Sequence, residues 1–504
     1  MSGPDLVTER LFQLDSKRSL AARIGSVIGF GALITATFMM FAEPLWRDAV
    51  ALFDGAPQYP QMAARSGKSA STSSLVAGPA VTLAEAQTAA PVGQPIPSPN
   101  SSMLPAAASV ANDTFSEQHN QSAGLSLKSS SVRGMTEKEL RFGMSAPFTG
   151  PSKELGQNMR LGIEAAFERA NDDGGVHGRM LRLVAADDGY EPSRTTATMK
   201  QLYEKDEVFG IVGNVGTPTA VVAVPYSLER KMLFYGAFTG ANLLRNDPPD
   251  RYVFNYRASY GEETEAIVRY LVKVKRLKPD QIAVFAQQDA YGDAGFAGVA
   301  KALRSLRGGN ESNILRLNYP RNTVNVEHAV EELKKQRGRI KAVVMVPTYR
   351  AAAKFIEKTR DAYPDMIYVS ISFVGSTALA NELVLLGPRY ANGVIVTQVV
   401  PAVEGHSSLV LDYKSALARH FPGEAPDYVS LEGYVTAKVL IAALKLNGPE
   451  LNTESLINTL ENLRNFDVGL GTPVNFGPSE HQAIHKVWGT QLDAAGHYHP
   501  IELD

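Results

Sequence analysis

The stretch LRFGMSAPFTGPSKELGQNMRLGIEAAFERANDDGGVHGRMLRLVAA, residues 140–186, decides the fold. Its two apolar ends, residues 140–146 and 180–186, predict strands. A helix is predicted between them over residues 153–171, because apolar side chains recur on one face at helical spacing. These side chains are Leu155, Met159, Ile163, Phe167 and Ala170. A strand, a helix and a second strand in this order indicate a parallel sheet.

The same alternation continues towards the C-terminus. Apolar runs such as QIAVFA (281–286) and AVVMVP (342–347) are separated by predicted helices. Such strands are typical of parallel sheets that helices cover on both faces, so the fold class is α/β. Residues 139–504 exceed one doubly wound domain, which predicts two Rossmann-like lobes with a cleft between them. Ligands of such sheets bind at the carboxyl ends of strands, next to helix N-termini.

The N-terminal part has a different composition. Residues 24–42, IGSVIGFGALITATFMMFA, carry no charge and are about long enough to cross a bilayer. Four basic residues precede this segment, so residues 1–23 are predicted to be cytoplasmic and the rest of the chain to lie outside the cytoplasm. We favour an uncleaved transmembrane anchor over a cleaved signal peptide, because no clear small-residue cleavage site ends the apolar run. Residues 43–138 are rich in Ala, Ser and Pro and predict a disordered linker.

Composition excludes several classes of function. The net charge of -2, without a basic stripe, gives no sign of nucleic-acid binding. The absence of cysteine excludes disulfides, thiolate metal sites and cysteine nucleophiles. No G-x-S-x-G, H-E-x-x-H or S-x-x-K motif occurs, so we expect no enzyme, no cofactor and no catalytic metal. Asp187 and Asp188 follow a strand and are expected to cap turns.

The loop in IVGNVGTPTAV, residues 211–221, is the strongest candidate for a binding site. It joins a predicted strand to a helix that begins near Pro218, which predicts Thr217 as the N-cap. A helix N-terminus attracts an anion, and the Thr217 hydroxyl is either a cap alone or also a ligand contact. The loop has neither the lysine of a phosphate-binding loop nor the spacing G-x-G-x-x-G. A small carboxylate therefore fits it better than a nucleotide.

Residues 142–192 contain P-x-T-G-x(5)-G, then N-x-x-G-G-x-x-G-R, and then D-D-x-x-x-P. In this order, and followed by FGIVGNVGTPTA, LFYGAFTGANL and AVVMVPTYRAAAKFI, they resemble the type I periplasmic binding proteins of the leucine/isoleucine/valine class. The resemblance covers the chain from about Leu140 onward. It implies two Rossmann-like lobes with parallel sheets joined by three crossover strands. Lobe one would contain residues 139–256 and 396–470, and lobe two residues 257–395 and 471–504.

The resemblance also implies a set of ligand-binding residues. Members of the family hold an amino acid's carboxylate on a hydroxyl residue of the first loop, which is Thr217 in this sequence. The full set that the resemblance implies is Thr217, Ala237, Thr239, Tyr291, Thr348, Tyr349 and Ser372. Amino-acid-binding members usually present an acid after the strand that matches MIYVSIS, whereas this chain has Ser372 and Phe373 there. Another acceptor replaces that acid, such as Ser372 with Asp289, or the ligand carries no ammonium.

Two functions follow from the resemblance. In the first, an extracytoplasmic solute-binding protein closes around an amino acid or small carboxylate and presents it to an ABC permease. In the second, a membrane-anchored sensor uses the same closure to signal to a partner. Both place the folded part in the bacterial periplasm or at the cell exterior, tethered to the inner membrane by residues 24–42.

Overall fold

A computed structural model of the chain describes residues 132–306, 313–336 and 338–504. The predicted cytoplasmic segment, the predicted anchor and nearly all of the predicted linker lie outside these residues. Within the described part of the chain, no helix is both long and apolar enough to cross a membrane.

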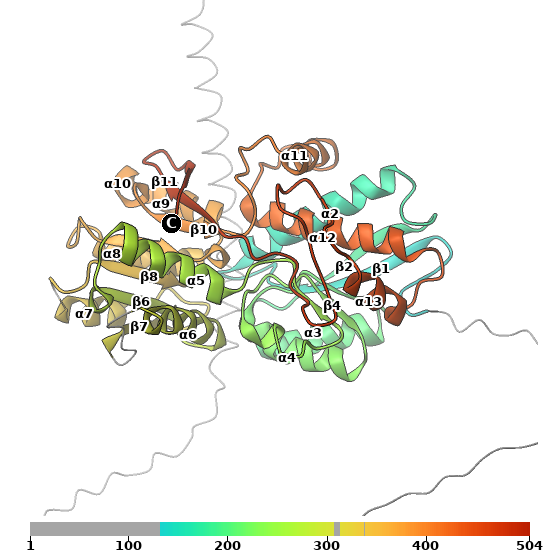
Figure 1. Cartoon of the computed structure of the whole chain (residues 1–504), viewed down its shortest axis with the longest axis horizontal. Helices are drawn as coiled ribbons and strands as arrows, with labels where there is room; N and C mark the ends of the chain where they lie inside the picture. The colour runs from blue at the N-terminus through green and yellow to red at the C-terminus, as the bar shows by residue number, and fades with distance from the viewer. Residues whose placement is uncertain (1–131, 307–312, 337) are drawn as a thin grey trace, which may run out of the picture. The chain divides into compact units, whose positions relative to one another are not determined.

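The first sheet, at the right of Figure 1, has five strands that all pair in parallel, in the order β2-β1-β3-β4-β5. The strands are β1 (Glu139–Ala146), β2 (Met180–Asp187), β3 (Gly210–Val212), β4 (Leu233–Tyr235) and β5 (Val253–Phe254). The helices of this lobe one are α2 (Lys153–Asp172), α3 (Pro192–Glu204), α4 (Thr217–Glu229), α11 (Ser408–His420), α12 (Tyr428–Asn447) and α13 (Thr453–Glu461). Helices α2 and α12 pack together although they are far apart in sequence.

The second sheet has seven strands in the order β12-β11-β10-β9-β8-β6-β7. β11 pairs antiparallel with both β10 and β12, and the other neighbouring strands pair in parallel. The strands are β6 (Ile282–Gln287), β7 (Leu315–Tyr319), β8 (Ala342–Val346), β9 (Ile367–Ser370), β10 (Ile395–Gln398), β11 (Trp488–Leu492) and β12 (Tyr498–Ile501). The helices of this lobe two are α5 (Tyr260–Arg269), α6 (Ala290–Arg304), α7 (Glu327–Lys335), α8 (Tyr349–Thr359), α9 (Ser376–Leu386) and α10 (Pro388–Ala391). Every side chain of β6 and β8 is buried, as a parallel sheet covered on both faces requires.

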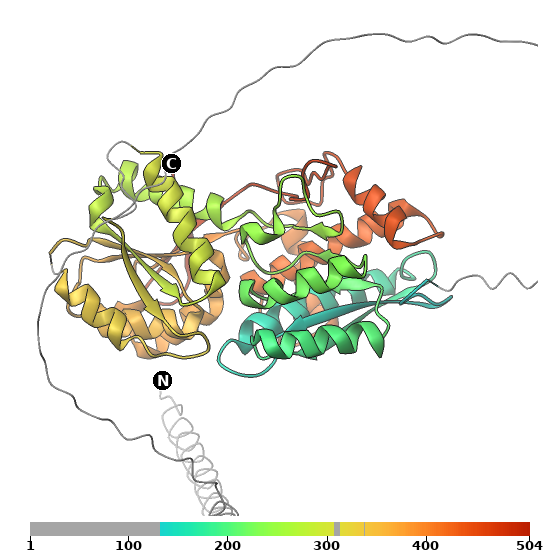
Figure 2. The ribbon, with the colours of Figure 1, turned by 90° about the horizontal axis from the view of Figure 1, so that it is seen from below.

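The chain passes between the lobes three times, after β5, after β10 and after α13 (Figure 2). Two of these segments are hydrogen-bonded: the N–H of Asn255 donates to His481 O at 2.7 Å, and the N–H of Ala483 donates to Asn255 O at 2.8 Å. The Tyr256 hydroxyl donates to Val399 O at 3.1 Å, and this bond connects the segment after β5 to the segment after β10. The predicted lobe boundary at residue 396 falls inside β10, which pairs with the second sheet.

Helix α9 (Ser376–Leu386) is not among the helices predicted from the sequence. Its sequence, STALANELVLL, is apolar on almost every side and has no polar face to mark a helical period. Gly375 precedes it and Gly387 follows it, both with positive φ (83° and 126°). Leu385 of this helix is 86 % exposed, so the all-apolar pattern does not reflect full burial.

Candidate functional site

The loop after β3 brings the first predicted site residue to the junction between the lobes. Gly216 has φ 103°, and a Cβ there would collide with the ring of Tyr190, so glycine is required. The prediction that Thr217 caps α4 is wrong, because Gly216 occupies the N-cap position and Thr217 is the first helical residue. The Thr217 Oγ1 instead lies 2.7 Å from Thr239 Oγ1, within hydrogen-bond distance. The Thr217 hydroxyl therefore belongs to a pair of threonines and not to a helix cap.

The loop after β4 supplies the second threonine of that pair. Ala237 and Thr239 are both buried, and the N–H of Thr239 donates to Ala237 O at 2.8 Å. The Oγ1 of Thr239 also accepts from the N–H of Ala241 at 3.3 Å. The structure thus brings Thr217, Ala237 and Thr239 together at the carboxyl ends of β3 and β4, where ligands of parallel sheets bind.

Lobe two contributes the predicted residues Tyr291, Thr348 and Tyr349 from the N-terminal ends of α6 and α8. The Tyr291 hydroxyl donates to Pro347 O at 3.3 Å, which joins the two loops. The N–H of Thr348 donates to the Tyr319 hydroxyl at 3.0 Å. Tyr349 is 1 % exposed, and its hydroxyl has no hydrogen-bond partner.

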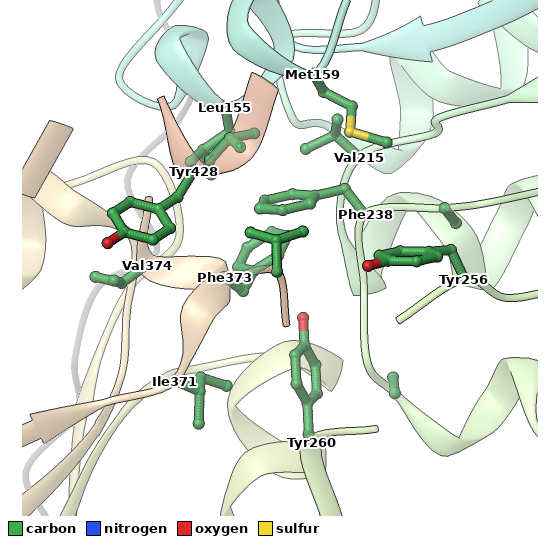
Figure 3. Close-up of a cluster of buried hydrophobic side chains, with 14 of the residues drawn as sticks. Leu155, Met159, Val215, Phe238, Tyr256, Tyr260, Ile371, Phe373, Val374 and Tyr428 are labelled. Carbon is green, nitrogen blue, oxygen red and sulfur yellow. The ribbon is translucent and has the colours of Figure 1, made fainter. Parts of the chain in front are cut away.

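Phe373 fills the space where these two groups of residues face each other. Its ring centroid lies 5.0 Å from that of Phe238 and 4.6 Å from that of Tyr291. The rings of Tyr190 and Tyr260 lie 6.2 and 6.3 Å away. Figure 3 shows Phe373 between Phe238 of lobe one and Tyr260. An apolar ring therefore stands where the family usually presents an acid.

A buried cluster of charged and hydroxyl groups lies next to this ring, and we call it the hinge network: Arg257, Glu263, Ser372, Thr397 and Glu432. The carboxylate of Glu263 accepts from four donors. These are Arg257 Nη2 at 3.0 Å, Ser372 Oγ at 3.1 Å, Ser372 N at 2.8 Å and Thr397 Oγ1 at 2.5 Å. Four donors use all the lone-pair positions of a carboxylate, so Glu263 has none left for a ligand.

Glu432, the second carboxylate of the hinge network, lies farther from Arg257 than Glu263 does. Arg257 is fully buried, and its Nη1 lies 3.5 Å from an oxygen of Glu432. Burial raises the pKa of Glu432 to about 7, against the opposing pull of Arg257. Arg257, Glu263 and Glu432 are not among the site residues predicted from the sequence. The one signal available was a charged residue in the apolar hinge run YVFNYRASY, which a buried position forces to find a partner.

The suggestion that Ser372 and Asp289 together replace the missing acid does not fit the geometry. Asp289 accepts from the N–H of Tyr291 at 3.0 Å through Oδ1. Its Oδ2 accepts from Gln287 Nε2 at 2.8 Å and from Arg321 Nη1 at 3.0 Å. Ser372 is bonded to Glu263 instead. Both groups are therefore already engaged with the protein.

Polar contacts also join the lobes at the edge of the junction. Arg321 of lobe two forms an ion pair with Glu191 of lobe one at 2.7 Å, and Asn322 donates to Glu191 at 2.6 Å. Gln287 donates to the Tyr190 hydroxyl at 3.3 Å. These contacts join the two lobes at this edge of the junction.

Asp187 and Asp188 stabilise loops, as the sequence predicts. Asp187 accepts from the N–H groups of Phe148 and Gly189, and Asp188 accepts from Tyr190 N, Ser145 Oγ and Thr195 Oγ1. Burial opposes the charge of Asp187, but its hydrogen bonds lower its pKa to about 2. Burial raises the pKa of Asp188 to about 6. Both carboxylates are occupied in shaping the loop that carries Tyr190.

Known proteins are similar to this chain in sequence and in fold. The model of the family described as periplasmic binding protein matches residues 139–497. Leu/Ile/Val-binding protein homolog 3 of Brucella melitensis biotype 1 is 25 % identical over 338 residues, which are 66 % of this chain and 86 % of that protein. An amino acid binding protein of Pseudomonas aeruginosa is 24 % identical over 334 residues, 65 % of this chain and 84 % of that one.

A solved structure gives a stronger similarity. A possible leucine/isoleucine/valine-binding protein from Rhodopirellula baltica SH 1 is 41 % identical, with a TM-score of 0.69. The similarity covers 73 % of this chain and 97 % of that one. It therefore extends over both lobes and all three connecting segments. The chain belongs to the periplasmic binding protein family, as a type I member of the leucine/isoleucine/valine-binding class.

Proposed function

We propose that the chain is an extracytoplasmic solute-binding protein that closes around a small amino-acid-like or carboxylate ligand and presents it to an ABC permease. The observation that carries this proposal is the contact between the lobes beside the predicted residues. Thr217 pairs with Thr239 in lobe one, and Phe373 of lobe two packs against Tyr291 of its own lobe and against Phe238, the neighbour of Thr239 in lobe one. Three segments connect the lobes. Hinge closure is the usual way in which such a pair of lobes takes up a ligand.

The names of the similar proteins support the same class of ligand. The relatives from Brucella and Rhodopirellula are described as leucine/isoleucine/valine-binding, and the relative from Pseudomonas as amino acid binding. None of these names describes an enzyme, and we infer that this chain catalyses no reaction. Its site of action would be the periplasm. Anchoring by residues 24–42 stays a prediction of the sequence.

The proposal can be tested on the full-length chain in mild detergent. A thermal-shift screen should contain branched-chain amino acids, their amides and small carboxylates, because a bound ligand raises the melting temperature by mass action. We expect at least one of these solutes to raise it. If none does so at millimolar concentration, the proposed ligand class is wrong.

The threonine pair gives a sharper test. Thr217→Ala should weaken binding of the best solute by about 1–3 kcal/mol, because it removes one partner of a buried hydroxyl pair. Thr196→Ala, which removes an exposed hydroxyl from α3, serves as the control and should leave the affinity unchanged. Isothermal titration of the folded variants measures both. Equal affinities for Thr217→Ala and Thr196→Ala would exclude Thr217 from the binding site.

A further inference from the structure

Arg245 is a half-buried residue of lobe one that lies just after the loop that follows β4. Its guanidinium donates to four oxygens. Nη1 donates to Ala241 O at 3.0 Å and to Thr239 O at 3.5 Å. Nη2 donates to Arg257 O at 3.0 Å, and Nε donates to Gln482 Oε1 at 2.5 Å. One side chain thus holds the loop after β4, the connecting segment after β5 and the connecting segment after α13.

The loop that Arg245 holds, residues 237–241, carries two of the predicted site residues, and we call it the Thr239 loop. Phe238 pairs with Val215 in an isolated bridge, but the residues after Phe238 pair with no strand. A loop outside a sheet has no ladder of backbone hydrogen bonds, so other donors must satisfy its carbonyls. Arg245 does so for Thr239 O and Ala241 O, and therefore fixes the conformation of this loop.

The carbonyl between these two is held by lobe two. The N–H of Tyr260, the first residue of α5, donates to Gly240 O at 2.7 Å. A Cβ on Gly240 would come within 2.7 Å of that nitrogen, so only glycine permits the contact. Three consecutive carbonyls of the Thr239 loop are thus bonded, the outer two by Arg245 and the middle one by the opposite lobe.

Gln482 extends the contacts of Arg245 to lobe two. It is 6 % exposed and lies in the connecting segment after α13. Its Oε1 accepts from Arg245, and its Nε2 donates to Glu262 Oε2 at 2.9 Å. Glu262 belongs to the first turn of α5. Arg245, Gln482 and Glu262 therefore form a hydrogen-bonded bridge from the Thr239 loop to the same helix that binds Gly240.

The geometry of this bridge requires an arginine. None of the four acceptors of Arg245 is a carboxylate, so attraction between opposite charges does not set its position. The guanidinium presents its donors in a rigid planar fork, which can reach acceptors on three sides at once. A lysine ammonium is a single point of charge and cannot reach oxygens of three segments together.

We propose that Arg245 is a positioning residue of the solute site, which holds the Thr239 loop in its binding conformation and couples that loop to lobe two through Gln482. This inference rests on the proposed function, because it gives Arg245 a part in binding the solute that the lobes enclose. Arg245 acts through Thr239, whose hydroxyl pairs with that of Thr217, and not by touching the solute. A loop that is ordered beforehand lowers the entropic cost of binding.

Isothermal titration of the full-length chain tests the role of Arg245. The probes are leucine and 4-methylpentanoate, which has the carbon skeleton of leucine without the amine. Arg245→Met should lower the affinity for any probe that the wild type binds by about tenfold or more, because it removes all four hydrogen bonds. Arg245→Lys keeps the charge without the fork and should recover only a small part of the affinity.

Arg360→Met is the matched control. Arg360 is also half-buried and donates to two backbone carbonyls, Tyr390 O and Asn392 O, but both lie in lobe two. Its replacement should leave the affinity unchanged. Equal affinities for Arg245→Met and Arg360→Met would overturn the positioning role and leave the proposed function in place. Full recovery in Arg245→Lys would also overturn it. Binding of neither probe by the wild type would count against the inference and the proposed function together.

Two further variants separate positioning from a general loss of stability. Independent effects on affinity multiply, so Arg245→Met and Thr239→Val should multiply if the two residues act separately. If Arg245 acts through the Thr239 loop, the double variant should bind little more weakly than the weaker single variant, and multiplying losses would contradict the proposal. Gln482→Met tests the bridge without changing Arg245 and should lower the affinity severalfold. Unchanged affinity in Gln482→Met would overturn the coupling to lobe two, even if Arg245→Met does not fold.

Discussion

At the hinge network, the carboxylate of Glu263 accepts four hydrogen bonds, whereas at the N-terminus of α12 one oxygen of Asp427 accepts two and the other none. Both residues are buried. Glu263 therefore uses its whole hydrogen-bonding capacity within the protein, and Asp427 uses half of it. A fully bonded buried charge stabilises one arrangement of the chain, whereas a buried oxygen without a donor contributes less to stability.

A substitution in the hinge network should lower the free energy of unfolding more than any other change considered below. Glu263→Gln removes the charge that balances Arg257 at 3.0 Å and leaves a buried cation with Glu432 as its remaining acid. We expect the free energy of unfolding to fall by about 3–5 kcal/mol. Denaturant unfolding measures the loss. Glu265→Gln, on the exposed side of the same helix, should change it by less than about 1 kcal/mol. Similar losses for both variants would show that the bonds to Glu263 are not the source of the stability.

The second carboxylate of the hinge network should make stability depend on pH. Burial raises the pKa of Glu432 from 4.5 to about 7, so the folded chain binds a proton that the unfolded chain releases. This contribution to stability is complete below pH 4.5 and is lost as the pH rises through 7. Its size is about 3 kcal/mol, at 1.36 kcal/mol per pKa unit.

The variant Glu432→Gln isolates that contribution. The difference in unfolding free energy between the wild type and the variant should decline from pH 4.5 to pH 7. Asp188, whose pKa is raised to about 6, remains in both proteins and cancels in the difference. A difference that does not change with pH would mean that Glu432 stays charged beside Arg257.

Substitutions at the N-cap of α12 should have smaller effects on stability. Asp427→Ala removes the oxygen that caps α12 and should cost about 1 kcal/mol. Asp427→Asn keeps an acceptor at the N-cap and removes only the charge, so it should cost clearly less. Denaturant unfolding of both variants without added solute measures the two costs. An equal loss for Asn and Ala would show that the charge, and not the capping oxygen, holds this end of α12.

The sheets could be predicted from the sequence, whereas the hinge network could not. Alternating apolar runs predicted the sheets because each of β6 and β8 is buried along its whole length. The sequence placed Thr217 and Thr239 in the loops after two strands, and they lie within hydrogen-bond distance because those strands, β3 and β4, pair in parallel. The hinge network could not be predicted in this way, because Glu263 bonds Ser372 and Thr397, residues 109 and 134 positions away.

The burial of Asp427 could not be predicted for a related reason. Asp427 precedes a helix in the sequence APDYVSLEG, and in the structure it is the N-cap of that helix, α12. The elements beside it include α2, α8 and α9, which are distant in sequence, and the sequence of α9 has no helical period that would reveal it.

Substitutions at the edge of the junction should have the smallest effect. Arg321 joins Asp289 of lobe two to Glu191 of lobe one, with side chains that are only partly buried. Arg321→Gln should therefore weaken the closed form by about 0.5–1 kcal/mol and lower the affinity for the bound solute by about two- to fivefold. Arg389→Gln, which breaks an exposed ion pair within lobe two, should leave the affinity unchanged. Isothermal titration of both folded variants with the best solute of the thermal-shift screen measures the difference. An equal affinity in the two variants would show that the ion pair between Arg321 and Glu191 does not contribute to closure of the lobes.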